Sequence, residues 1–311
     1  MIGRGWIAVL VVWLVMTPPA IAQALPFLIE VEARIETAAG EPYAADSFVA
    51  ELAAAEVVYL GETHTRAADH LAELAILTAL YQANPHLALG LEMFQRPFQP
   101  VLDRYLAGEI DAATLRQQSE YDSRWHYPWQ YYAPILHFAQ THQIPLVALT
   151  APAEVTERVA LKGPQALQPD DLRYVPAAAD WELGPPPYRQ LMQALYKEIH
   201  QGLGAAQGFD RFFTVQILWD ETMAAAIAQF YQTHHRPVLV LAGQGHLVYN
   251  FGIPDRVQRR LGSDIQQQTV LLNPATDLAV ETERAIADFL WHTPLPPELA
   301  PPNARHTDRS T

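Results

Sequence analysis

A glycine followed three residues later by a histidine closes two apolar runs of this chain, and this repeated pattern constrains the fold most. Gly61 and His64 follow the first run, and Gly243 and His246 follow the second. Such short apolar runs are typical of buried strands in a parallel sheet. A glycine at the carboxyl end of a strand allows a sharp turn and a close approach to a ligand. Because ligands bind at this edge of open α/β sheets, we expect both histidines to face one crevice.

The remaining elements alternate between strand and helix. Leu71, Leu74 and Leu77 give the segment 66–82 helical apolar spacing. Strands that alternate with helices predict an α/β fold with a central, mostly parallel sheet flanked by helices. Strands are expected at 56–60, 87–91, 145–149, 237–242 and 267–272, and the strand at 267–272 is expected to be the last strand of the chain. Helices are expected at 66–82, 97–107, 129–142, 151–161, 188–202, 209–232 and 254–261.

Proline content divides the chain into its predicted regions. Residues 163–187 carry many prolines and show no clear period, and a predicted helix at 188–202 follows them. Together they predict a helical, proline-rich cap insertion over the sheet at about 163–208. The polar, proline-rich residues 291–311 are predicted to form a disordered tail. Residues 23–290 are then a single α/β domain, a size at which one domain buries a substantial core.

The first residues have the pattern of a secretory signal peptide. Arg4 supplies a positive charge, residues 6–16 form an apolar run, and Ala20 and Ala22 form an A-x-A cleavage site. The run has 11 residues, which is too short to span a bilayer comfortably. We therefore expect residues 1–22 to be a signal peptide and the protein to be exported to the periplasm or cell envelope. A retained N-terminal anchor is the alternative.

Composition excludes several kinds of site. The chain has no cysteine, which excludes thiolate metal ligands, cysteine nucleophiles and a lipobox lipid anchor. The formal net charge of −14 argues against a nucleic-acid partner, because phosphate binding needs a basic patch.

Four side chains with acid–base or metal-ligand chemistry are expected at the crevice: Glu62, His64, Glu92 and His246. Histidine acts as a general base or a metal ligand, and a paired carboxylate fixes its tautomer. These four are therefore the predicted catalytic residues of a hydrolase and the predicted ligands of a divalent metal. Structural roles are the alternatives: Glu62 capping a helix, Glu92 pairing with Arg96 on the surface, and His246 starting a helix.

Two other segments supply candidate residues. Asp220 on the helix 209–232 either orients an active-site histidine or lies on a solvated face. Trp125, His126 and Tyr127 open an aromatic segment that is able to wall a flat hydrophobic ligand such as a porphyrin. Tyrosine and histidine are both haem-iron ligands. The alternative is that these aromatic residues anchor a loop onto the core.

At these residues the chain resembles the ChaN-like family of haem-binding, iron-regulated proteins. That family belongs to a wider superfamily with the erythromycin esterases and the Tiki/TraB proteins. The resemblance covers roughly residues 54–272. The matching pieces are residues 58–64, 89–94, 132–136, 144–149, 216–224 and 243–246.

The resemblance implies an α/β fold and haem binding, at a dimer interface or a surface shared with the helical cap. It implies that Gly61, His64, Gly243, His246 and Asp220 contact the cofactor, with the aromatic residues above as wall candidates. In the esterase branch the four crevice residues form a hydrolytic centre, and in the Tiki branch the paired turns are linked to metal-dependent proteolysis. The chain departs from many ChaN-like proteins in lacking the lipoprotein cysteine.

Three functions follow as hypotheses. The first is an exported haem-binding protein that contributes to iron or haem uptake, with envelope uptake proteins as partners and a homodimer as a further option. The alternative is a metal-dependent or His/Glu-based esterase or peptidase that uses the crevice. The third is a structural partner in an envelope complex.

Overall fold

The computed structural model describes residues 33–199, 208–274 and 280–293. The predicted signal peptide at 1–22 and all but the first three residues of the predicted tail at 291–311 lie outside them. None of the described helices combines the length and the apolar composition that crossing a lipid bilayer requires.

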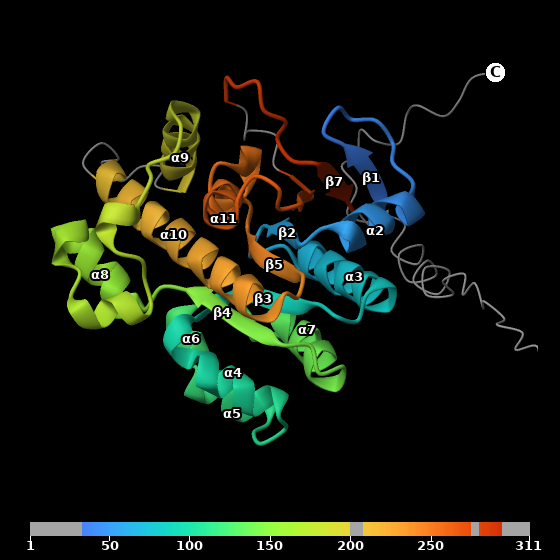
Figure 1. Cartoon of the computed structure of the whole chain (residues 1–311), viewed down its shortest axis with the longest axis horizontal. Coiled ribbons are helices and arrows are strands. Elements are labelled where there is room, and N and C mark those ends of the chain that lie inside the picture. Colours follow the sequence, from blue (N-terminus) through green and yellow to red (C-terminus); the bar gives the residue numbers. More distant parts are fainter. Residues whose placement is uncertain (1–32, 200–207, 275–279, 294–311) are drawn as a thin grey trace, which may run out of the picture.

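A seven-stranded sheet runs through the middle of the molecule (Figure 1). Its strand order is β1-β7-β6-β2-β5-β3-β4, and every neighbouring pair is parallel except β1 and β7. The predicted α/β fold with a mostly parallel sheet is therefore confirmed. The strands are β1 (Arg34–Thr37), β2 (Val57–Glu62), β3 (Ala88–Gln95), β4 (Leu146–Thr150), β5 (Val238–Gly243), β6 (Gln267–Leu272) and β7 (Phe289–His292).

Helices cover both faces of this sheet (Figure 1). Side chains of a strand alternate between faces, and β2 shows the result: Val58 and Leu60 join the core under α2, α3 and α7, whereas Val57 and Tyr59 join the core under α9, α10 and α11. The helices are α2 (Ala45–Ala54), α3 (Ala67–Ala83), α4 (Gln99–Leu106), α5 (Ala112–Gln118), α6 (Tyr121–Arg124), α7 (Trp129–Thr141), α8 (Ala153–Lys162), α9 (Pro186–Ile199), α10 (Phe209–His234) and α11 (Ile253–Leu261).

The last strand differs from the sequence prediction. The expectation that 267–272 is the last strand is wrong, because β7 follows it and pairs with both β6 and β1. β7 reaches two residues into the predicted tail, and its Trp291 is fully buried. Four residues are too few for a reliable periodicity, so only packing against Phe48 and the sheet defines this strand.

The predicted cap insertion contains three short 3-10 turns and then α9. The turns are at Pro164–Ala166, Pro169–Arg173 and Ala178–Asp180. Buried contacts fix this segment to α10 and α11, because the Glu182 amide donates to Glu221 and its carbonyl accepts from Arg256.

Candidate functional site

The two glycine–histidine turns lie side by side at the carboxyl edge of the sheet. β2 and β5 are neighbouring parallel strands, with Gly61 opposite Ala242 and Glu62 opposite Gly243. The two apolar runs predicted as strands are therefore neighbours in the sheet. Each turn therefore begins at the same level of the sheet.

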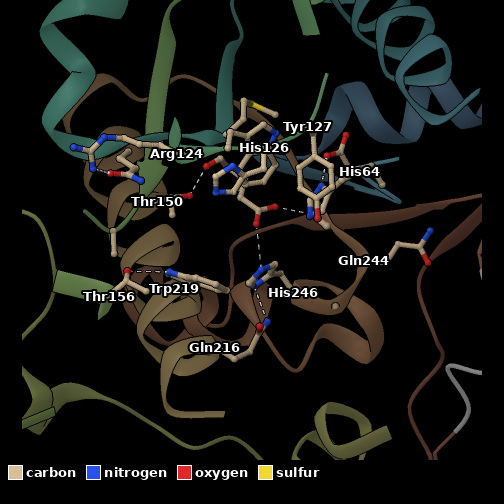
Figure 2. Close-up of a pocket in the computed structure, with 18 of the residues that line it drawn as sticks. His64, Arg124, His126, Tyr127, Thr150, Thr156, Gln216, Trp219, Gln244 and His246 are labelled. Carbon is tan, nitrogen blue, oxygen red and sulfur yellow. Dashed lines mark hydrogen bonds and ion pairs between the residues drawn. The ribbon is translucent and has the colours of Figure 1, made fainter. Parts of the chain in front are cut away.

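A cavity of about 700 Å³ opens at this edge (Figure 2). We call it the strand-end cavity. Such a volume lies within the range of pockets for cofactors and other small molecules. Its lining comes from both turns, the aromatic segment, α8, α9 and α10, and includes Glu62, His64, Glu92, Trp125, His126, Tyr127, Met192, Leu195, Phe212, Gln216, Trp219, Gly243, Gln244 and His246.

His64 is held by Glu62 at one nitrogen and faces the cavity with the other. Nδ1 lies 2.5 Å from Oε1 of Glu62, whose side chain is fully buried, whereas the His64 side chain is 21% exposed. Burial alone would lower the pKa of His64, but the hydrogen bond to Glu62 and the charge of Glu92 raise it. Nε2 points toward Gly243, where a Cβ atom would lie only 2.8 Å away.

The aromatic segment covers the ring of His64. The ring centroids of Trp125 and Tyr127 lie 4.8 and 4.7 Å from that of His64. His126 between them adopts φ 51°, a left-handed conformation that is uncommon outside glycine. Figure 2 shows Tyr127 and His64 next to each other. All three predicted wall residues therefore line the strand-end cavity.

His246 lies between two carboxylates. Its Nδ1 is 2.6 Å from Oδ1 of Asp220 on α10 and its Nε2 is 3.3 Å from Oε1 of Glu92. The amide of Gln216 is also 2.8 Å from Nδ1 (Figure 2). Burial alone would lower the pKa of His246, but Glu92 and Asp220 raise it to about 10. Of the two alternatives for Asp220, contact with a site histidine is the one observed.

Glu92 joins the two histidines electrostatically. It lies inside β3, which runs on to Gln95 past the predicted end at Leu91, and a register shift against β4 occurs between these two residues. One carboxylate oxygen accepts a 2.7 Å hydrogen bond from the Gly243 amide. Burial alone would raise the pKa of Glu92, but His246 and His64 lower it.

A second polar cluster lies behind Glu62. Oε1 of Glu62 accepts a 2.6 Å hydrogen bond from the hydroxyl of Tyr132, and Oε2 is 3.0 Å from Nδ1 of His70. The same Nδ1 lies 3.0 Å from Oε2 of Glu73. Burial alone would raise the pKa of Glu62, but hydrogen bonds with His64 and His70 hold it below its usual range.

The predicted site residues occupy different places around the cavity. His64, Glu92, Gly243 and His246 line it together with Glu62. Two others lie behind its wall. Gly61 is inside β2, where a Cβ would meet Leu271 at 2.7 Å, and Asp220 is fully buried behind His246.

One residue of the predicted four-residue metal set, Glu62, also belongs to a second group of ligand-type side chains. Among the described residues, the group whose three ligand atoms lie within 4.8 Å of one another is Glu62, His70 and Glu73. Glu62, His64, Glu92 and His246 all line the cavity, and their joint role as metal ligands stays a prediction.

Sequence reasoning missed His70, Glu73 and Tyr132. The apolar spacing of 66–82 includes Leu71, which is 62% exposed, whereas Asp69, His70 and Glu73 are buried on α3. Because a histidine and a glutamate three residues apart share one helix face, the spacing of His70 and Glu73 was the available signal.

Comparisons with family models and with solved structures found proteins similar to this chain. A family model described as haem-binding uptake, Tiki superfamily, ChaN matches residues 48–257. A solved structure of ChaN of Campylobacter jejuni, described by its cofacial heme binding, is 18% identical, covers 83% of this chain and 96% of its own, and superposes with a TM-score of 0.67. A mutant of the erythromycin esterase EreC in its open conformation is 13% identical, with coverage of 77% and 76% and a TM-score of 0.45.

One curated relative is a plant protein. Protein RETICULATA-RELATED 5, chloroplastic, of Arabidopsis thaliana is 27% identical over an alignment of 255 positions that covers 77% of this chain. The match spans 34% of the length of that relative. The family model, by contrast, matches more than half of the present chain and includes both glycine–histidine turns. The chain therefore belongs to the haem-binding uptake, Tiki superfamily, ChaN family.

Proposed function

We propose that this protein binds haem in the strand-end cavity and serves haem or iron uptake. The observation that carries the proposal is the aromatic cover of His64, whose Nε2 faces a cavity of about 700 Å³. The family is described as haem-binding, and the ChaN structure of Campylobacter jejuni by its cofacial heme binding.

The cavity has the chemistry that a porphyrin needs. Trp125 and Tyr127 offer flat apolar surface, and Met192, Leu195 and Phe212 line the same cavity from the side of the cap and α10. Histidine and tyrosine side chains are haem-iron ligands, and His64, His126 and Tyr127 supply them here. Haem would supply an iron centre, and these residues would hold it and shield its face from water.

We also propose that the protein is exported, with residues 1–22 removed near Ala22, and acts in the periplasm or cell envelope. The support is the charged start, the short apolar run and the A-x-A site of the sequence. Envelope haem and iron-uptake proteins are the proposed partners, and a homodimer is the proposed assembly when a bound haem is shared between two copies.

A haemin titration tests the proposal. We expect purified protein from Gln23 onward to give a saturable, shifted Soret band with fixed stoichiometry. Replacing the candidate ligands in the variants His64→Ala and Tyr127→Phe is expected to weaken or shift it. His142→Ala is the matched control, because this histidine contacts Tyr81 and Phe138 near the end of α7, away from the cavity lining. A featureless, non-saturating titration of the unmodified protein would overturn haem binding.

A hydrolase is the second candidate function. The favouring observation is that two histidines at the cavity are each held at Nδ1 by a buried carboxylate, Glu62 for His64 and Asp220 for His246. Such pairing fixes the tautomer and orients the imidazole for proton transfer. In this function His64 is the base for water. Ester and peptide turnover that disappears in His64→Ala, with the fold retained, is the expected result.

A further inference from the structure

Two carboxylates and one imidazole nitrogen converge behind the strand-end cavity. We call Glu62, His70 and Glu73 the buried triad. Nδ1 of His70 lies 3.0 Å from a carboxylate oxygen of each glutamate. The side chains of both glutamates have no exposed surface, and that of His70 is 3% exposed. The cluster is therefore an interior feature and not an acidic patch on the surface.

The hydrogen bonds of the triad are incomplete. Oε1 of Glu73 is buried and has no hydrogen-bond partner, and Oε2 of Glu62 has only Nδ1 of His70 near it, at 3.0 Å. The single N–H group at Nδ1 of His70 can donate a good hydrogen bond to one carboxylate, but two carboxylates lie at the same distance from it. Because an unpaired buried carboxylate is costly, the two glutamates need either a proton on one carboxyl group or a bound cation between them.

The contacts around the triad resemble the hydrogen bonds that hold the ligands of a metal site in place. Nε2 of His70 lies 3.2 Å from the backbone carbonyl of His64, and donation to that carbonyl leaves Nδ1 free to bind an ion. Tyr132 donates to the other oxygen of Glu62, and the ring of Tyr131 stacks on His70 at 4.6 Å. Metal-bound histidines nearly always donate their second N–H to a carbonyl or carboxylate, and their carboxylate partners are hydrogen-bonded in turn.

The spacing also fits one ion. Ligand atoms that bind zinc at about 2.0–2.2 Å lie roughly 3 to 3.5 Å apart around it. The two 3.0 Å distances to Nδ1 are of this size, and all three ligand atoms lie within 4.8 Å of one another. One imidazole and two carboxylates suit a borderline divalent ion such as zinc.

We propose that Glu62, His70 and Glu73 bind a divalent transition-metal ion of the zinc class at a structural site behind the strand-end cavity. His70 and Glu73 are not among the residues that line the cavity, and Glu62 is the residue that the cavity and this site share. Glu62 uses one oxygen for the ion and the other for His64, so the ion also fixes the orientation of that histidine.

The test is zinc binding by the full chain after dialysis against a chelator. With a competing zinc indicator, we expect one tight site per chain and a higher melting temperature with zinc, because an ion that binds the native state stabilises it. His70→Ala and Glu73→Gln are expected to weaken zinc binding at least a hundredfold. His246→Ala is the matched control for the cavity, and it should keep both the stoichiometry and the affinity.

The visible absorption spectrum of the unmodified chain with Co²⁺ tests the proposed metal site even when the variants fail to fold. Co²⁺ at one equivalent is expected to give visible bands of a low-coordinate site, and zinc should abolish them. Absence of tight zinc binding and of these bands in the unmodified chain would overturn the proposal. Loss of the site in His246→Ala but not in Glu73→Gln would also overturn it, because the ion would then lie at the cavity. Neither readout depends on haem.

Discussion

Gly243 leaves empty the space into which the ring of His64 projects. A Cβ at Gly243 would lie 2.8 Å from Nε2 and 2.9 Å from Cε1 of His64, and 3.7 Å from Oε2 of Glu92. The glycine of one turn therefore sets the position of the histidine of the other. This contact links the two turns more directly than the pairing of their strands.

Gly243→Ala tests this relationship. The added methyl group is expected to push His64 away from Glu92, to weaken haem binding and to cost about 1–3 kcal/mol of unfolding free energy through overpacking. Haemin titration and urea unfolding measure the two effects. Gly245→Ala is the control, because its Cβ would meet Leu195 no closer than 3.4 Å. Equal haem affinity in both variants would contradict the prediction.

The hydroxyl of Tyr132 supports Glu62. Tyr132→Phe removes a 2.6 Å hydrogen bond to a fully buried carboxylate, and we expect a loss of about 1.5–3 kcal/mol of unfolding free energy. Tyr131→Phe keeps the ring that stacks on His70, so it should cost far less. Urea unfolding of the two variants side by side provides the measurement. A Tyr132→Phe variant as stable as the unmodified chain would show that its hydroxyl does not support Glu62.

The stability of the protein is expected to fall on the alkaline side of neutrality because of His246. Glu92 and Asp220 raise its pKa to about 10 against the desolvation of burial, from an ordinary value of 6.5. The protonated ring therefore stabilises the fold fully below pH 6.5, and this contribution is lost as the pH rises toward 10. The pKa of Glu92 is lowered from 4.5, so its contribution is present above pH 4.5 and is lost on further acidification.

Asp220→Asn tests how much His246 contributes to this pH dependence of stability. The variant removes a partner that raises the pKa of His246, so the alkaline loss should begin at lower pH and be smaller. At neutral pH the broken buried ion pair is expected to cost about 3–5 kcal/mol. Urea unfolding from pH 4 to 10 gives both quantities. Burial alone would lower the pKa of His70, but Glu62 and Glu73 raise it to about 10, and this variant leaves His70 unchanged. A loss of stability at alkaline pH identical to that of the unmodified chain would therefore assign the effect to His70 and refute the role of His246.

Arg256 fixes the predicted cap insertion to the body of the protein. Its side chain is 2% exposed, and its Nε lies 3.2 Å from Glu221, which is fully buried. Arg256→Leu leaves that carboxylate with fewer partners, and we expect a loss of about 3–5 kcal/mol. Arg284→Leu breaks an ion pair with Asp255, in which the arginine side chain is 47% exposed. We therefore expect a loss of only about 0–1 kcal/mol of unfolding free energy. Thermal unfolding compares the stability of the two variants, and equal losses of stability would contradict the prediction that the buried ion pair matters more.

The amino-acid sequence by itself determined the α/β fold and the place of the site. The short apolar runs that end at Gly61 and Gly243 are recognisable from the sequence alone, because buried parallel strands are apolar over their whole length. The rule that ligands bind at the carboxyl edge then predicted His64, Glu92 and His246 at one cavity. The helix of Asp220 was predicted, but which of its faces is buried was not.

Only the tertiary structure decided which polar groups meet inside the protein. Strand β7, the buried face of α3 and the contact of Asp220 with His246 all depend on packing between segments far apart in the chain. A buried polar residue such as His70 or Glu73 reads locally as a solvent-facing residue. Its burial is stable only because partners from β2 and α7 come within hydrogen-bond distance, and sequence periodicity carries no information on such partners.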